Sequence, residues 1–150
     1  MKDKIVNLDR INKIITWLNK YDINEYTIND DLTIDVKGHV GLYKYPNKEL
    51  PKYIQFNRVD GDFEICFSDI ISLKGVPKEC KGFDCSDCYN LTSLKGAPEK
   101  CKWFDCSYCE KLTSLEGAPT KCEEIYCRHC KGNFTEEDVR KVCDAKKIYD

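Results

Sequence analysis

The sequence has no long apolar run. No stretch approaches the roughly 18 apolar residues that cross a bilayer, so no membrane span is predicted. Near the start, two apolar residues, Ile5 and Val6, stand before Asn7, and Asp9 follows soon after. That is too short for the apolar core of a secretory signal. We therefore expect a cytoplasmic protein with no membrane attachment.

A dominant charge is also missing. The 24 basic and 26 acidic residues leave a formal net charge of -2. This balance gives no strong overall field to attract nucleic acid or an acidic membrane. A chain of 150 residues is enough for one domain with its own core.

Signatures of catalysis are scarce. The sequence contains no phosphate-cradling glycine loop, paired-carboxylate motif or other known catalytic string. The two histidines are His39 and His129. A thiol nucleophile needs a base within hydrogen-bond reach, but the repeat register described next puts His129 and Cys130 on opposite faces. We predict that the chain is not an enzyme.

The second half of the chain is built on an internal repeat. GFDCSDCYNLTSLKGAPEKC, residues 82–101, aligns at every position with WFDCSYCEKLTSLEGAPTKC, residues 103–122, at an offset of 21 residues. A worn copy occupies residues 61–80. A period of about 20–29 residues is typical of stacked β-containing coils, in which each unit buries its apolar face against its neighbours. The matching columns are Leu73, Leu94 and Leu115; Gly75, Gly96 and Gly117; and Pro77, Pro98 and Pro119.

The eleven cysteines follow the same period, and all lie at or after Cys66. Without a secretory signal a reducing compartment is expected, which favours free thiols or a metal over disulfides. Nine of them form three columns: Cys80, Cys101 and Cys122; Cys85, Cys106 and Cys127; and Cys88, Cys109 and Cys130.

The repeated LTSL segment, followed by Gly-x-Pro, resembles a leucine-rich repeat over residues 50–134. It is most similar to the short bacterial-effector type. Small proteins with an N-terminal helix, a hairpin and LTSL-x-G-x-P repeats also resemble products of bacteriophage and prophage genomes. The departure from the family pattern is cysteine where leucine, valine or asparagine is usual.

These observations predict an α+β fold, a short leucine-rich-repeat-like β solenoid with a cap at each end. Residues 1–49 are expected to form an N-terminal helix and β-hairpin cap, residues 50–134 the coils, and residues 135–150 a C-terminal capping helix and tail. The helix is placed at residues 3–21, with Leu8, Ile11, Ile15 and Leu18 on its buried face. Strands are expected over residues 26–45. Thr135 is expected to cap the last helix, with Ile148 and Tyr149 behind it.

The cysteine columns allow two interpretations. Two C-x-x-C pairs separated by 17 residues, with a third pair beyond, fit a zinc site. The ligands would be Cys85, Cys88, Cys106, Cys109, Cys127 and Cys130. The other interpretation makes every column a set of core residues, because free cysteine behaves as a small hydrophobe. The register favours the core, since it also explains the first cysteine column and the glycine, proline and leucine columns.

A partner-binding surface is expected on the outward positions of the strands, which a repeat stack presents as an extended concave sheet. Tryptophan, tyrosine and arginine are common interface anchors. The same side chains also form cross-strand pairs, so Trp103 is predicted either to bind a partner or to pack on Tyr126 or Tyr108. Trp17 in the N-terminal helix is interpreted as core. The candidate binding residues are Trp103, Tyr108, Tyr126, Arg128, His129, Asp84 and Asp105.

The sequence therefore favours a non-catalytic protein-protein interaction module without a cofactor. The phage-like resemblance implies an inhibitor of a host defence protein, such as an anti-CRISPR that docks on a host nuclease or ribonucleoprotein effector. The alternative is a zinc-binding structural or nucleic-acid-binding domain. Asp84, Asp87 and Asp105 beside the C-x-x-C pairs disfavour direct contact with nucleic-acid phosphates.

Overall fold

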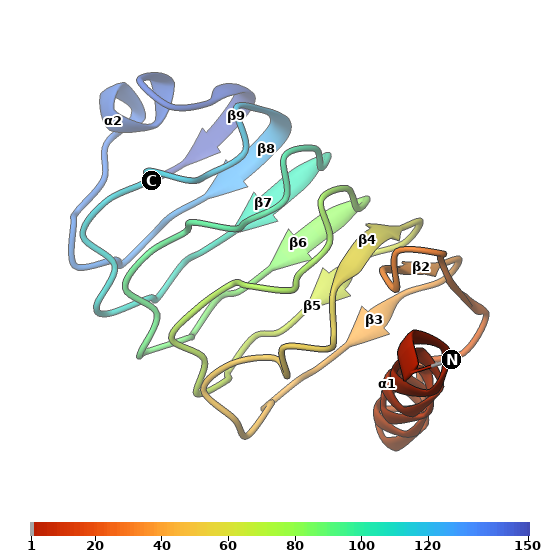
Figure 1. Ribbon diagram of the computed structural model, residues 1–150. Helices are drawn as coiled ribbons and strands as arrows, with labels where there is room; N and C mark the ends of the chain where they lie inside the picture. Colours follow the sequence, from red (N-terminus) through yellow and green to blue (C-terminus); the bar gives the residue numbers. More distant parts are fainter. Residues whose placement is uncertain (1) are drawn as a thin grey trace.

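The chain folds into a stack of β coils with a helix at each end (Figure 1). The computed structural model describes the chain from Lys2 to Asp150, and its side chains from Asn7 onward. Six strands form one parallel sheet in the order β3-β5-β6-β7-β8-β9. Their bounds are Val40–Gly41, Phe63–Glu64, Gly82–Asp84, Trp103–Asp105, Lys121–Tyr126 and Asp144–Tyr149. The predicted solenoid is confirmed at this level.

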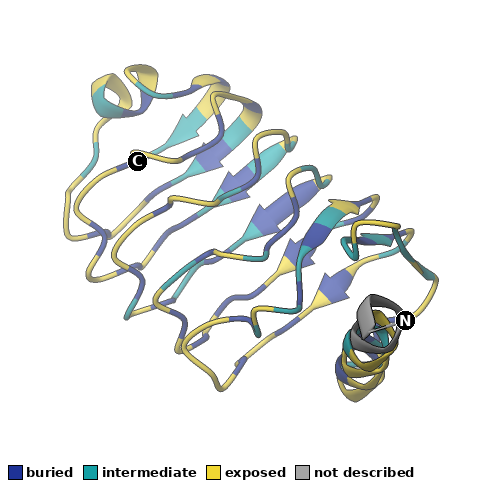
Figure 2. Cartoon of the chain, in the orientation of Figure 1, coloured by how far each residue is buried: buried dark blue, intermediate teal, exposed yellow. Residues whose placement is uncertain are grey.

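One inward column runs through the whole sheet. Phe83 is the register partner of Phe63 on one side and of Phe104 on the other. The rings stack with centroids 5.7 and 5.5 Å apart, close to the spacing of adjacent strands. Val40 begins the column, and Ile125 and Ile148 end it. Figure 2 shows dark blue, buried residues within the inner strands, whereas β9 at the C-terminal end is mostly yellow or teal.

The return segments explain the glycine and leucine columns. Leu91 and Leu94 are fully buried, and Ala97 donates its N–H to the carbonyl of Leu94 to close the turn. Gly96 in that turn has φ +94°, a conformation that side chains with a Cβ rarely adopt. Gly117 has the same φ, and a Cβ there would lie 2.6 Å from the Leu94 carbonyl carbon. Close stacking of consecutive turns therefore requires glycine.

The N-terminal cap holds helix α1, Lys2–Lys20, and a three-stranded sheet in the order β1-β2-β4. Strands β1, Tyr26–Ile28, and β2, Ile34–Val36, form the predicted antiparallel hairpin, while β4, Phe56–Val59, pairs parallel with β2. The bounds predicted for the helix are confirmed to within one residue.

The buried face of α1 differs from the predicted one. Ile14 and Trp17 are buried beside Leu18, whereas Leu8 is 60% exposed and Ile15 only half-buried. The indole of Trp17 packs edge-on against Tyr45 and Phe56, each at 6.3 Å between ring centroids. The face of the helix that carries Trp17 therefore packs against the first coil. The interpretation of Trp17 as a core residue is confirmed.

The C-terminal cap is partly as predicted. Thr135 caps helix α2, Glu136–Arg140, in a reciprocal capping box with Asp138. Ile148 and Tyr149 lie in β9, a strand that extends the sheet beside β8 and that contacts α2. The segment DAKKIY pairs with KCEEIY as a further strand. The coils thus run from Val40 to Tyr149, beyond the predicted limits of 50 and 134 at both ends.

Candidate functional site

The cysteines of the second and third columns are buried. Those of the third column also bond to the coil before their own. Cys88, Cys109 and Cys130 donate their S–H groups to the carbonyls of Ile65, Cys85 and Cys106, at 3.3, 3.3 and 3.1 Å. In the coil that contains β5, Ser68 takes this place and bonds to the carbonyl of Leu42 in the coil before it. The third column therefore joins consecutive coils.

Burial raises the pKa of Cys88 and of Cys127 to about 12, so neither has the low pKa typical of a nucleophilic cysteine. His129 is exposed while Cys130 is buried, as the register predicted. Within the described part of the chain, no three histidine, cysteine, aspartate or glutamate side chains are grouped so that they could hold a metal ion. The geometry of the C-x-x-C pairs thus lends no support to the zinc alternative.

Trp103 covers a glycine on the neighbouring strand. Trp103 in β7 is the register partner of Gly82 in β6. A Cβ on Gly82 would lie 1.9 Å from the indole Cε2 atom. Among the described residues, Tyr108 and Tyr126 form their ring pairs with His129 and Tyr149 and not with Trp103. The indole shields an otherwise bare backbone instead.

Tyr126 and Arg128 are engaged within the protein. The ring of Tyr126 stacks on Tyr149 of β9, with centroids 4.3 Å apart and planes at 4°. Its hydroxyl donates to Glu124 at 2.7 Å, which raises the pKa of Tyr126 to about 12. The guanidinium of Arg128 lies 5.3 Å from the Tyr149 ring centroid. Tyr126 and Arg128 are therefore paired with other side chains of the protein at the C-terminal end of the sheet.

The acidic candidate residues accept backbone hydrogen bonds at the points where two strands end. Asp84 and Asp105 are register partners, and their Oδ1 atoms accept the backbone N–H of Ser86 and Ser107, each at 2.8 Å. Burial is the main cause of a raised Asp105 pKa, and the nearby Asp84 and Asp87 carboxylates add to it. Glu64 continues the row on β5. Among the described residues, none of these four carboxylates forms an ion pair.

Beside this row lies a second one, which we name the left-handed row. Each member follows the end of a strand and has φ between 54° and 58°. Its members are Lys44, Phe67, Asp87, Tyr108 and His129. Tyr108 stacks on His129 at 4.7 Å, and Phe67 meets Tyr43 edge-on at 5.4 Å. Both Phe67 and Tyr108 are 46% exposed.

Sequence reasoning named Asp87, Tyr108 and His129 in that row but missed Phe67. The signal was present, because the worn repeat carries ICFS where the next carries CSDC, and Ile65 occupies the place of Cys85. Ser68 instead of cysteine at the fourth position hid the match. Phe67 therefore joins Tyr108 as an exposed aromatic on the same edge.

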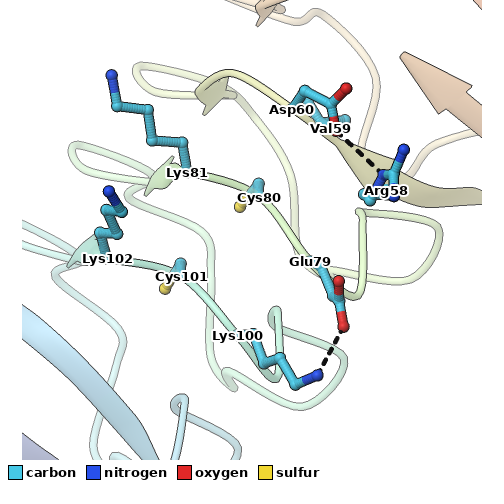
Figure 3. Close-up of a pocket in the computed structure, with 9 residues that line it drawn as sticks. All are labelled: Arg58, Val59, Asp60, Glu79, Cys80, Lys81, Lys100, Cys101 and Lys102. Atoms are coloured by element: carbon cyan, nitrogen blue, oxygen red, sulfur yellow. Dashed lines mark hydrogen bonds and ion pairs between the residues drawn. The ribbon is translucent and has the colours of Figure 1, made fainter. Parts of the chain in front are cut away.

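The lysines of the return segments lie on a different edge. A groove of about 480 Å³ is lined by Cys80, Cys101 and charged side chains (Figure 3). Lys81 and Lys102 point the same way in it, while Lys100 pairs with Glu79 at 2.9 Å. A second ion pair joins Arg58 to Asp60, and such exposed pairs contribute little to binding or stability. The lining holds four basic and two acidic side chains, which is a small basic excess.

Comparison of the chain with protein-family models, curated proteins and solved structures gave no match. The helices in the described part of the chain lack the length and apolar character that a membrane crossing requires. The site is therefore interpreted from its own geometry.

Proposed function

We propose that this chain is a non-catalytic protein-binding module that holds an arginine-containing, basic segment of a partner protein. The segment lies along what we name the aromatic–acidic edge, formed by Glu64, Phe67, Asp84, Asp87, Asp105 and Tyr108. The observation that carries the proposal is the presence of exposed aromatic side chains at left-handed backbone positions.

Folding alone disfavours these aromatics. Phe67 and Tyr108 have φ 56° and 58°, where a residue with a Cβ costs about 1 kcal/mol and glycine or asparagine is preferred. Their exposed fraction of 46% means that little of this cost is offset by burial. Contact with a partner would supply the missing burial.

The charges favour a basic occupant. Glu64, Asp84 and Asp105 are register neighbours on β5, β6 and β7. Adjacent strands lie about 4.8 Å apart, and like charges directly opposite each other destabilise a sheet. Since these carboxylates form no ion pair with any described residue, a partner's cations would relieve the repulsion.

The protein already uses this chemistry at its own ends. Arg128 lies over Tyr149 at 5.3 Å, and Lys44 lies over Tyr43 at 5.2 Å from the ring centroid. An arginine from outside can lie over Tyr108 or Phe67 in the same manner, and it can pair with a carboxylate through its planar fork. Because lysine lacks this planar fork, the edge should bind arginine in preference to lysine.

The predicted binding residues carry unequal weight in this proposal. Tyr108, Asp84 and Asp105 belong to the edge, and His129 supports it by stacking on Tyr108. Trp103, Tyr126 and Arg128 are occupied by contacts inside the sheet. The narrower role of an inhibitor of a host defence protein, docking on a nuclease or ribonucleoprotein effector, rests on the family resemblance and would use the same edge.

The test is a titration of the full chain with fluorescently labelled nona-arginine, nona-lysine and nona-glutamate peptides, followed by anisotropy at several salt concentrations. We expect nona-arginine to bind more tightly than nona-lysine, and nona-glutamate not to bind. Combined Phe67→Ala and Tyr108→Ala should weaken nona-arginine binding about fivefold to thirtyfold, because each exposed cation–π contact contributes about 0.5–1 kcal/mol. Nona-lysine binding should change less.

Two further variants separate charge from aromatic contact. Asp84→Asn with Asp105→Asn keeps the acceptors for Ser86 and Ser107 but removes two charges, and should weaken both basic peptides. The matched control is Ile71→Ala, an exposed apolar side chain on a return segment. Equal losses in the control, or no binding of either basic peptide, would contradict the proposal.

A further inference from the structure

Two buried thiols meet at the C-terminal end of the stack, away from the aromatic–acidic edge. Cys122 lies in β8, and Cys143 immediately precedes β9. Their Sγ atoms are 3.4 Å apart and share a hydrogen bond. Cys143 follows Cys122 by 21 residues, the repeat distance, although the register partner of Cys122 on β9 is Ala145. All eleven cysteines of the described chain are free.

We propose that Cys122 and Cys143 form a redox-active dithiol, which hydrogen peroxide converts into an intrachain disulfide joining β8 to the start of β9. This modification site is independent of the proposed binding function. The sulfurs are near enough to react after a small movement, because a disulfide needs an S–S distance of about 2.05 Å.

A sulfur–sulfur contact combined with access distinguishes this pair: Cys80 and Cys101 also line a groove, but among the described residues no hydrogen bond joins their sulfurs. Cys122 lines a groove of about 730 Å³, and Cys143 lines a second hollow of about 450 Å³. Cys109 and Cys85 are fully buried instead, and Cys109 gives its S–H to a carbonyl. A small oxidant can therefore approach the Cys122–Cys143 pair from outside.

The position in the fold also favours reaction. Cys143 lies between α2 and β9, and β9 is the last strand of the sheet order. Edge elements with neighbours on one side open locally at lower free energy than central ones. The short segment between α2 and β9 can shift by the distance that bond formation requires without disturbing the inner coils.

The reaction proceeds in two balanced steps. The Cys143 thiolate attacks one oxygen of hydrogen peroxide, the O–O bond breaks, and hydroxide leaves as water after taking up a proton. The resulting sulfenic acid is then attacked by the sulfur of Cys122, the S–O bond breaks, and a second water leaves with the remaining proton. In total, two thiols are oxidised and one peroxide is reduced to two waters. The hydrogen bond from Cys122 lowers the pKa of Cys143, in keeping with Cys143 as the attacking sulfur.

The experiment treats the reduced full chain with hydrogen peroxide, titrates thiols in denaturant, and maps the linkage by mass spectrometry after trypsin digestion. We expect the thiol count to fall from eleven to nine. Cleavage beside Lys121, Arg128, Lys141 and Lys146 should yield CEEIYCR linked to VCDAK. Because CEEIYCR also contains Cys127, the measurement is repeated in Cys127→Ala, where the link should persist.

A thermal measurement supplies the second readout. Closing a loop of about 20 residues should raise Tm by roughly 6–10 °C in the oxidised protein. Cys122→Ser should abolish both the link and the shift, while Cys101→Ser, in the same column, should leave both unchanged. The proposal is overturned if all eleven thiols survive a peroxide excess that oxidises the unfolded chain, or if the links join other pairs such as Cys85 and Cys109.

Discussion

The contact between Trp103 and Gly82 predicts that the effect of Gly82→Ala on stability changes sign when the indole of Trp103 is removed. In Gly82→Ala the new Cβ takes the place of the indole, because the two would lie 1.9 Å apart. The ring must then leave the backbone of β6. No backbone difficulty arises at Gly82 itself, since it is not among the residues with positive φ.

The magnitude follows from the area that one face of the ring covers. A tryptophan buries up to about 250 Å² in full, and one face against a strand accounts for roughly 50 Å². At about 25 cal/mol per Å² this contact contributes about 1.2 kcal/mol. Alanine offsets part of that loss, since it is favoured over glycine in a strand by about 0.5 kcal/mol. Gly82→Ala should therefore destabilise the protein by about 0.7 kcal/mol.

In a Trp103→Ala background the same Gly82→Ala substitution should stabilise the protein by about 0.5 kcal/mol, because no ring remains to be displaced. Urea unfolding of the four proteins gives the coupling free energy, expected at about 1.2 kcal/mol. Fluorescence in a Trp17→Phe background should show Trp103 emission shifted to the red by Gly82→Ala. The reasoning fails if the substitution has the same effect in both backgrounds, or if the emission does not move.

Two further predictions test the turns and the acidic row. Gly117→Ala should destabilise by about 2–3 kcal/mol and Gly96→Ala by about 1 kcal/mol in urea unfolding, because both need φ +94° but a Cβ meets backbone at 2.6 Å in the first and 3.2 Å in the second. Equal losses of stability in the two variants would argue against the clash as the cause of the difference. Asp105→Asn keeps the acceptor for Ser107 and removes a charge that burial disfavours, since burial raises the folded-state pKa of Asp105. Relative to this variant, the native protein should be most stable below the unfolded pKa of about 3.9 and lose that advantage as pH rises through the folded pKa. A native protein that gains stability over Asp105→Asn between pH 3 and 7 would contradict this.

Much of the stack could be predicted from sequence because its determinants repeat. The inward placement of Phe83, Phe104 and the second and third cysteine columns follows from the period alone, and these residues are buried. The strand at Asp144–Tyr149 was missed because the coil before it contains α2, which displaces the repeat by two residues, so that Ile148 rather than residue 146 pairs with Ile125.

The site was harder to predict than the fold. Outward positions could be listed from the alternation of a strand, but their contacts depend on the size of the neighbour across the register. Trp103 packs on Gly82, its counterpart in the aligned repeats, where the missing side chain leaves room for the indole, and Tyr126 stacks on Tyr149 of a strand that the period did not predict. Likewise, Trp17 replaced Ile15 on the buried face of α1, because tertiary contact with Tyr45 and Phe56 outweighs spacing.

Each third-column side chain bonds to the preceding coil, so the stability of the stack is approximately a sum of terms between neighbouring coils. Cys109 reaches only to the carbonyl of Cys85, and Phe104 stacks only on its neighbours in the column. Among the described residues no contact of this kind spans two coils, so the central units are interchangeable in structural terms. Duplication or loss of a whole 21-residue unit would lengthen or shorten the surface offered to a partner while each new junction repeats an existing one. The length of the aromatic–acidic edge, which we propose binds a partner, can thus change in evolution by whole units without redesign of the core.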